Sequence, residues 1–110
     1  MSYKVVTIRP FDRQVKRLLK KYPSLKLELV ELVKQLQENP KQGTDIGNNC
    51  FKIRLAISSK GKGKSGGARV ITNLYITKDT VILLAIYDKS EQANISDKQI
   101  ASLLDKIIVD

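Results

Sequence analysis

The fold class is decided at residues 50–57, CFKIRLAI, where apolar and polar side chains alternate. Every second residue from Phe51 to Ile57 is apolar, and the positions between them include Lys52 and Arg54. A period of two is typical of a β-strand with one apolar and one polar face. The sequence therefore predicts a strand that presents two cations on the same side of a sheet.

Two more strands are expected downstream of this one. Residues 58–67, SSKGKGKSGG, are too rich in glycine for regular structure and predict a hairpin connection. The strand expected at 69–76 places Arg69 and Tyr75 on one face, and we expect the Arg69 side chain to be exposed. The apolar run at 81–87 predicts a strand that is covered on both faces.

Helices are expected on either side of these strands. Residues 3–8 predict a first strand, after which apolar side chains at helical spacing predict a basic helix over 10–22 and a second helix over 24–39. Residues 41–49 have the composition of a loop, and a Ser-x-x-Gln capping box opens a last helix over 96–108. The predicted order is β-α-α-β-β-β-α, an α+β fold with a small, mainly antiparallel sheet, an N-terminal helical hairpin and a C-terminal helix.

The composition limits the size, the compartment and the chemistry of the protein. The chain has 110 residues with one Cys and no His, and that length predicts a single domain over residues 1–110. One cysteine, no apolar leader and no apolar run of about 20 residues predict a cytoplasmic protein without a membrane span. The lack of histidine excludes imidazole zinc sites, Ser-His-Asp nucleophile activation and histidine acid–base pairs.

Positive charge is concentrated in the middle of the chain. The formal net charge is +9, and residues 46–78 hold seven Lys or Arg without one Asp or Glu. A block of this kind attracts polyanions and is typical of nucleic-acid binding, although lysines that keep sheet edges soluble are an alternative. Lys60, Lys62 and Lys64 do not have P-loop spacing, and we interpret them as candidate contacts to nucleic-acid backbone phosphates, with a disordered hairpin tip as the alternative.

Three cations of the expected strands form a more specific candidate site than the loop lysines do. If the two strands pair across the glycine-rich loop, alternation brings Lys52, Arg54 and Arg69 onto one sheet face, where they would converge on one anion. Three separately solvated strand cations are the alternative. Lys89 would join from the end of the following strand, unless it is an ordinary loop lysine.

The carboxylates and the cysteine predict no metal or cofactor site. Asp45, Asp79, Asp88 and Asp97 fall at loops and caps, where Asp commonly forms local hydrogen bonds. A two-metal nuclease needs several clustered acids. Cys50 has no histidine to activate it, so we expect a small buried side chain.

The motifs of residues 50–96 resemble those of one family. The strand 50–55, the glycine hairpin, Gly67–Ile71 and Val81–Glu91 resemble the RelE toxins of bacterial type II toxin–antitoxin systems, within the RelE/ParE superfamily. The Gly-Lys loop and the segment after Tyr87 look especially like its HigB-like branch. The resemblance implies a RelE-like fold, a cognate antitoxin partner and no cofactor.

The resemblance also implies an activity on the ribosome. Such a toxin is a metal-independent endoribonuclease that cuts mRNA in the ribosomal A site and inhibits translation. The mRNA 2′-hydroxyl attacks the neighbouring phosphate, leaving a 2′,3′-cyclic phosphate and a 5′-hydroxyl. Basic residues would then take the place of a histidine pair.

By the same resemblance, four residues are candidates for catalysis. Lys52 matches a position assigned to general-base or charge-stabilising work, and Arg54 matches a second basic position that can only stabilise charge near pH 7. Arg69 matches the arginine that would bind the scissile phosphate. Lys89 falls where many members place another phosphate-stabilising arginine.

The sequence departs from the family after the last strand, where RelE has a tyrosine that stacks on a base. The matching stretch reads Asn94–Ser96, which leaves the proton donor unassigned and Tyr75 and Tyr87 as candidate RNA-stacking rings. The alternatives are a ParE-like inhibitor of DNA gyrase and a non-catalytic RNA-binding module. The basic cluster favours the nuclease, because the gyrase-directed branch has no need of it.

Overall fold

The computed structural model describes residues 2–58 and 66–107. The elements of this part are β1 (Lys4–Thr7), α1 (Arg9–Lys21), α2 (Leu25–Glu38), β2 (Thr44–Gly47), β3 (Cys50–Leu55), β4 (Ala68–Tyr75), the 3₁₀ turn η2 (Ile76–Lys78), β5 (Thr80–Asp88) and α3 (Asp97–Leu104). The predicted α+β class is confirmed, with one strand more than expected.

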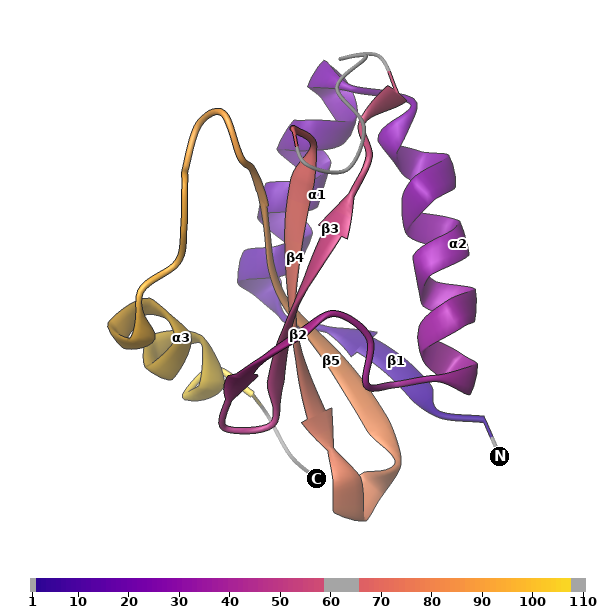
Figure 1. Cartoon of the computed structure of the whole chain (residues 1–110), viewed down its shortest axis with the longest axis vertical. Helices are drawn as coiled ribbons and strands as arrows, with labels where there is room; N and C mark the ends of the chain where they lie inside the picture. Colours follow the sequence, from indigo (N-terminus) through magenta and orange to yellow (C-terminus); the bar gives the residue numbers. More distant parts are fainter. Residues whose placement is uncertain (1, 59–65, 108–110) are drawn as a thin grey trace.

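The strands form a single five-stranded sheet in the order β1-β5-β4-β3-β2 (Figure 1). β1 lies parallel to β5, whereas all the other neighbours are antiparallel. The hairpin predicted between the two basic strands is present, because β3 and β4 pair from Cys50 opposite Asn73 to Leu55 opposite Ala68. β4 is the middle strand of the sheet.

The additional strand, β2, lies within the stretch predicted as a loop, so that prediction is wrong for Thr44–Gly47. Asn48 and Asn49 both have positive φ, 55° and 59°, as in the two-residue hairpin turns that asparagine tolerates. This turn folds the segment back on β3, with Thr44 opposite Lys52. The pairing comes from the turn and the free edge of β3 and not from alternation within β2.

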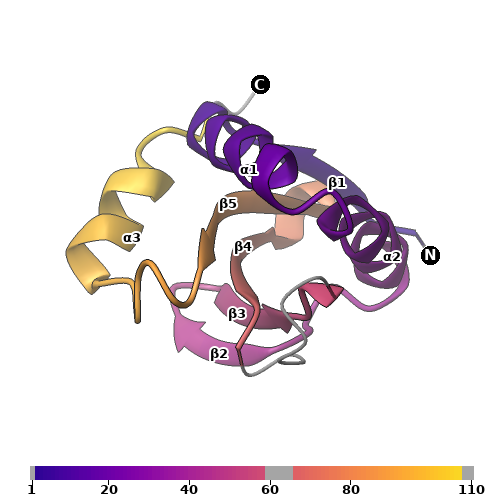
Figure 2. The same cartoon turned by 90° about the horizontal axis from the view of Figure 1, so that it is seen from above.

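The main core lies between one side of the sheet and the helices α1 and α2, which lie close together over β5 and β1 in Figure 2. Leu18 of α1 and Leu25 and Leu36 of α2 are fully buried in this core. A buried leucine of this kind contributes about 1.5–3 kcal/mol relative to an exposed one. The apolar run of β5 is buried from Val81 to Tyr87, which confirms its predicted cover on both faces.

Helix α3 lies on the other side of the sheet from α2 (Figure 2). Its predicted capping box is confirmed: Gln99 N donates to Ser96 Oγ at 3.1 Å and Ser96 N donates to Gln99 Oε1 at 2.9 Å. The helix ends at Leu104 and does not reach Ile108 as predicted, because Lys106 N and Ile107 N donate to carbonyls three residues back and no longer to carbonyls four residues back. Ile108 itself lies outside the described residues.

The helices of residues 2–58 and 66–107 are too short or too polar to cross a membrane.

Candidate functional site

Two arginines and a tyrosine form a row across three neighbouring strands. Arg54 of β3 lies opposite Arg69 of β4, and Arg69 lies opposite Tyr87 of β5. Paired residues of antiparallel strands project from the same face, with Cα atoms about 4.5–5.5 Å apart. Lys52 is two residues from Arg54 and shares that face. The structure therefore brings Lys52, Arg54 and Arg69 together.

The three cations differ in their access to solvent. Arg54 is exposed and Lys52 is half-buried, but Arg69 is only 4% exposed, so the expectation of an exposed Arg69 is wrong. The reason is its place on the middle strand, between Arg54 and Tyr87. The guanidinium turns back along its own strand, where Nη1 donates to the Ala68 carbonyl at 3.1 Å.

The segment after β5 borders this face and supplies a contact that the sequence did not predict. Lys52 Nζ donates to Asn94 Oδ1 at 3.5 Å. Within the described residues, neither Lys52 nor Arg54 forms an ion pair, and the acid of the adjoining turn, Glu91, is engaged elsewhere. The accessible part of the face is therefore positively charged, as a site for a phosphate requires. The sequence singles out Asn94 only as part of the stretch Asn94–Ser96, so its contact with Lys52 could be identified only from the fold.

The two candidate stacking tyrosines are placed differently. Tyr87 is 5% exposed and lines a hollow of about 220 Å³ together with Ile95 and Leu103, so its ring offers no open face to a base. Tyr75 lies six residues from Arg69 along β4, a separation of about 20 Å at the usual rise of a strand. Neither ring is therefore placed to stack on a base bound beside Lys52 and Arg54.

The Tyr87 hydroxyl is buried and has no hydrogen-bond partner among the described residues. Burial raises the pKa of this phenol above its ordinary value of 10.0, while the charge of Arg69 acts in the opposite direction. Tyr87 is therefore protonated at neutral pH. An unpartnered buried hydroxyl costs stability, because it has lost its water without gaining a protein acceptor.

Tyr87→Phe is expected to raise the free energy of unfolding by about 1 kcal/mol at pH 7, since it removes the unpartnered hydroxyl and keeps the ring. The raised pKa means that the unfolded chain loses this proton first, so wild-type stability falls as the pH rises above about 10. The variant has no phenol to ionise at this position, so the difference between its free energy of unfolding and that of the wild type increases as the pH rises above about 10. Urea unfolding at pH 7 and at pH 10 to 11 tests both expectations; a variant less stable than the wild type throughout contradicts them.

Lys89 lies in the turn after β5, beside the start of the strand that carries Arg69. Its side chain is exposed, and its backbone N donates to the Gly67 carbonyl at 3.1 Å. This hydrogen bond ties the turn to the residue that precedes β4. The loop lysines predicted to contact RNA, Lys60, Lys62 and Lys64, lie outside the described residues.

Cys50 is fully buried, which confirms the expected small core side chain. Its Sγ accepts from Asn73 Nδ2 at 3.5 Å, and burial raises the pKa of the thiol. The Cys, Asp and Glu side chains of residues 2–58 and 66–107 form no cluster of three that could hold a metal ion.

Comparison with known proteins places this fold in one class, the small toxins of toxin–antitoxin systems. The family model described as the RelE toxin of the RelE/RelB toxin–antitoxin system matches residues 8–107. The chain therefore belongs to the RelE toxin family. Membership makes it a toxin and implies an antitoxin partner.

Solved structures share the fold over most of the chain. A variant of the E. coli toxin RelE with two arginine-to-alanine substitutions, in the free state, matches with a TM-score of 0.63 and 16% identity over 98% of this chain and 100% of that chain. The isolated E. coli RelE toxin gives 0.57 and 16% over 96% and 100%. A metal-bound toxin from Helicobacter pylori gives 0.52 and 19% over 84% and 99%. At these identities the likeness establishes the fold.

Proposed function

We propose that this toxin is a ribosome-dependent mRNA endonuclease of the HigB-like branch, which acts in the cytoplasm as one domain over residues 1–110 and cuts the codon in the A site. The observation that carries the proposal is the pair of arginines directly opposite each other, Arg54 and Arg69, with Lys52 on the same face. Like charges on paired strand positions repel. A phosphate group bound to Lys52 and Arg54 above the covered Arg69 would relieve that repulsion.

The proposed reaction uses the RNA's own nucleophile and no metal ion. The 2′-hydroxyl attacks the adjacent phosphorus and the bond to the 5′ oxygen breaks, leaving a 2′,3′-cyclic phosphate and a 5′-hydroxyl. Negative charge grows on the phosphoryl oxygens in the transition state, where fixed cations stabilise it more than in the ground state. The protein's task is therefore to present positive charge to one phosphate.

The cations differ in solvent exposure, and we assign them different roles on that basis. Lys52 and Arg54 reach the surface and are assigned direct contact with the phosphate oxygens. Arg69 is covered and is assigned charge stabilisation from below, and Lys89 adds charge from the turn beside it. Arginine keeps its charge near pH 7, so Arg54 and Arg69 take no part in proton transfer.

One observation favours a second candidate, a non-catalytic RNA-binding module. Arg69 is only 4% exposed, so a bound phosphate meets two of the three strand cations directly. A module of this kind would bind RNA and ribosomes with an affinity that falls steeply with salt, because counterions are released. It would leave the RNA intact.

Mapping of mRNA ends after brief expression in bacteria distinguishes the candidates. The nuclease predicts new 5′ ends inside reading frames, in phase with codons, within minutes of induction. Growth arrest with altered DNA supercoiling and no new ends would favour a gyrase inhibitor. Neither cleavage nor arrest would favour the binding module.

A further inference from the structure

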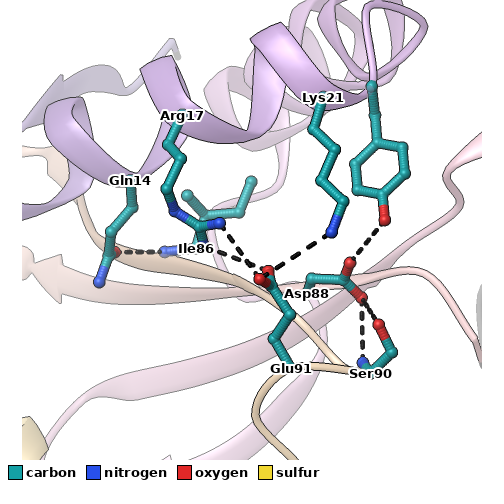
Figure 3. A network of polar contacts seen from close by, with 8 residues as sticks. Gln14, Arg17, Lys21, Ile86, Asp88, Ser90 and Glu91 are labelled. Atoms are coloured by element: carbon teal, nitrogen blue, oxygen red, sulfur yellow. Dashed lines mark hydrogen bonds and ion pairs between the residues drawn. The ribbon is translucent and has the colours of Figure 1, made fainter.

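A row of polar side chains on α1 reaches the end of β5 and the turn that follows it (Figure 3). Three members, Gln14, Arg17 and Lys21, are spaced so that they share one side of the helix, and the fourth is Tyr22, the C-cap residue that follows α1. Their partners are Ile86, Asp88 and Glu91, and Ser90 joins through Asp88. Together these eight residues are called the α1–β5 network.

The first contact of the network satisfies a backbone group on a part of β5 that β1 does not reach. β1 pairs with β5 only as far as Leu83, so the rest of this edge of β5 has no strand beside it among the described residues. Gln14 Oε1 accepts a hydrogen bond from Ile86 N at 3.0 Å and satisfies a backbone donor on that edge. Helix α1 therefore holds the half of β5 that leads to the candidate site.

The second contact is a buried carboxylate at the end of β5. Asp88 is 0% exposed, and its Oδ2 accepts from the Tyr22 hydroxyl at 3.0 Å. Its Oδ1 accepts from Ser90 N at 3.0 Å and from Ser90 Oγ at 2.8 Å. A buried carboxylate without donors would be strongly unfavourable, and these three bonds contribute to holding Asp88 and Ser90 in place.

The carboxylate shapes the turn that carries Lys89. The Asp88 carbonyl also accepts from the backbone N–H groups of Glu91 and Gln92, both at 3.0 Å. Asp88 lies opposite Ala68, the residue before Arg69, and Lys89 N donates to the Gly67 carbonyl. The turn is thus bonded to the start of β4 through Lys89 and Gly67, and to the end of α1 through Asp88 and Tyr22.

The outer contacts of the network contribute less. Arg17 Nη2 lies 3.2 Å from Glu91 Oε1, and Lys21 Nζ lies 4.0 Å from Glu91 Oε2. All three side chains are exposed, and ion pairs in water are screened and weak. The ordering of the turn therefore depends on the buried carboxylate and its hydroxyl donors.

We infer that Asp88, held by Tyr22 and Ser90, is a positioning residue for the cationic face. It sets the place of Lys89 and of the strand start that carries Arg69, and it does not itself touch RNA. This inference rests on the proposed function, whose site it extends to helix α1. The sequence alone predicts only local hydrogen bonds for Asp88.

Two conservative variants test the inference, each with a matched control. Tyr22→Phe removes one donor to Asp88, and Tyr3→Phe makes the same change at a half-buried tyrosine outside the network. Ser90→Ala removes the hydroxyl of an exposed residue, and Ser90→Thr retains a hydroxyl. All four changes are small enough to leave the core in place.

The readouts are amide hydrogen exchange by NMR and the kinetics of mRNA cleavage on ribosomes. Tyr22→Phe and Ser90→Ala are expected to speed exchange at Ser90, Glu91 and Gln92 about tenfold, as loss of one hydrogen bond to a carboxylate implies. They are also expected to lower kcat about tenfold with KM unchanged within twofold. Tyr3→Phe and Ser90→Thr should behave as the wild type.

Each outcome decides one part of the inference. Unchanged exchange in both Tyr22→Phe and Ser90→Ala overturns the positioning of the turn, whatever the activity. Faster exchange with unchanged kcat overturns the link between the turn and the site. If the wild type itself does not cleave, the proposed function fails separately, and the exchange rates alone decide whether Asp88 positions the turn.

Discussion

Replacing both Lys52 and Arg54 by alanine is expected to slow mRNA cleavage at least about 100-fold without unfolding the protein. These are the accessible cations of the face, and the proposed mechanism assigns both of them to the charge that develops on the phosphate. Removal of one preorganised donor to an oxyanion typically costs about 100- to 1,000-fold in rate. Single-turnover cleavage of mRNA on ribosomes measures the loss, and thermal unfolding verifies the fold.

A control for the change of net charge removes two lysines from a different surface. Lys26 and Lys34 lie on α2, away from the cationic face, so their double alanine variant has the same net charge as the test variant. We expect it to cleave within about threefold of the wild type, because exposed charges beyond a Debye length of about 8 Å are largely screened. A test variant that cleaves as fast as this control would remove the cationic face from the mechanism.

Arg69→Ala is a less direct test than its position in the cluster suggests. The side chain is buried and bonded to the Ala68 carbonyl, so truncation changes packing in the middle of the sheet as well as charge. A loss of cleavage in that variant would not separate the two causes. The accessible positions on β3 give the cleaner answer.

A large effect on stability is also expected for Gly67→Ala, which should lower the free energy of unfolding by about 2–3 kcal/mol. A Cβ at this position would overlap the Leu55 carbonyl oxygen and lie 3.0 Å from Ile57 N. Both are backbone atoms and cannot rotate away as a side chain would. The base of the β3–β4 hairpin must therefore open, and urea unfolding at pH 7 measures the cost.

Gly47→Ala is the control that distinguishes the effect of a steric clash from the effect of backbone strain. Gly47 has a φ of +89°, but a Cβ added there would have no atom within 4 Å, so the substitution meets strain without a clash. We expect a loss of about 1–2 kcal/mol for a left-handed residue with a side chain. A loss for Gly67→Ala that is no larger than the loss for Gly47→Ala would contradict the packing at the hairpin base.

Gly67→Ala should also reduce cleavage, because the Gly67 carbonyl accepts from Lys89 N. Opening the hairpin base displaces the turn and the start of β4 together. Gly47 lies on the edge strand, away from this turn, so Gly47→Ala should retain cleavage in proportion to the folded fraction.

Local patterns in the sequence predicted much of the fold. The alternation at β3 identified a strand with Lys52 and Arg54 on one face, and the Ser96–Gln99 pair identified the start of α3. Both patterns involve only a few neighbouring residues, so they can be recognised without knowledge of the tertiary structure. β2 lacks such a signal, since its pairing depends on the turn at Asn48 and Asn49 and on a free strand edge.

The burial of individual side chains could not be predicted from local patterns. A period of two assigns Arg69 to a face, but its burial follows from the position of β4 in the middle of the sheet. Strand order is a property of the whole fold. The same holds for contacts between distant segments: Lys52 and Asn94 are 42 residues apart, and Tyr22 and Asp88 are 66 apart.

The most direct test of the proposed activity uses purified protein and ribosomes stalled on a defined mRNA, with the chemistry of the new RNA ends as the readout. We expect a single cut in the A-site codon, with a 2′,3′-cyclic phosphate and a 5′-hydroxyl, for the wild type but not for the Lys52→Ala, Arg54→Ala double variant. Free mRNA should remain intact. Intact ribosome-bound mRNA with the wild type would exclude the proposed nuclease, and equal cutting by both proteins would exclude Lys52 and Arg54 from its site.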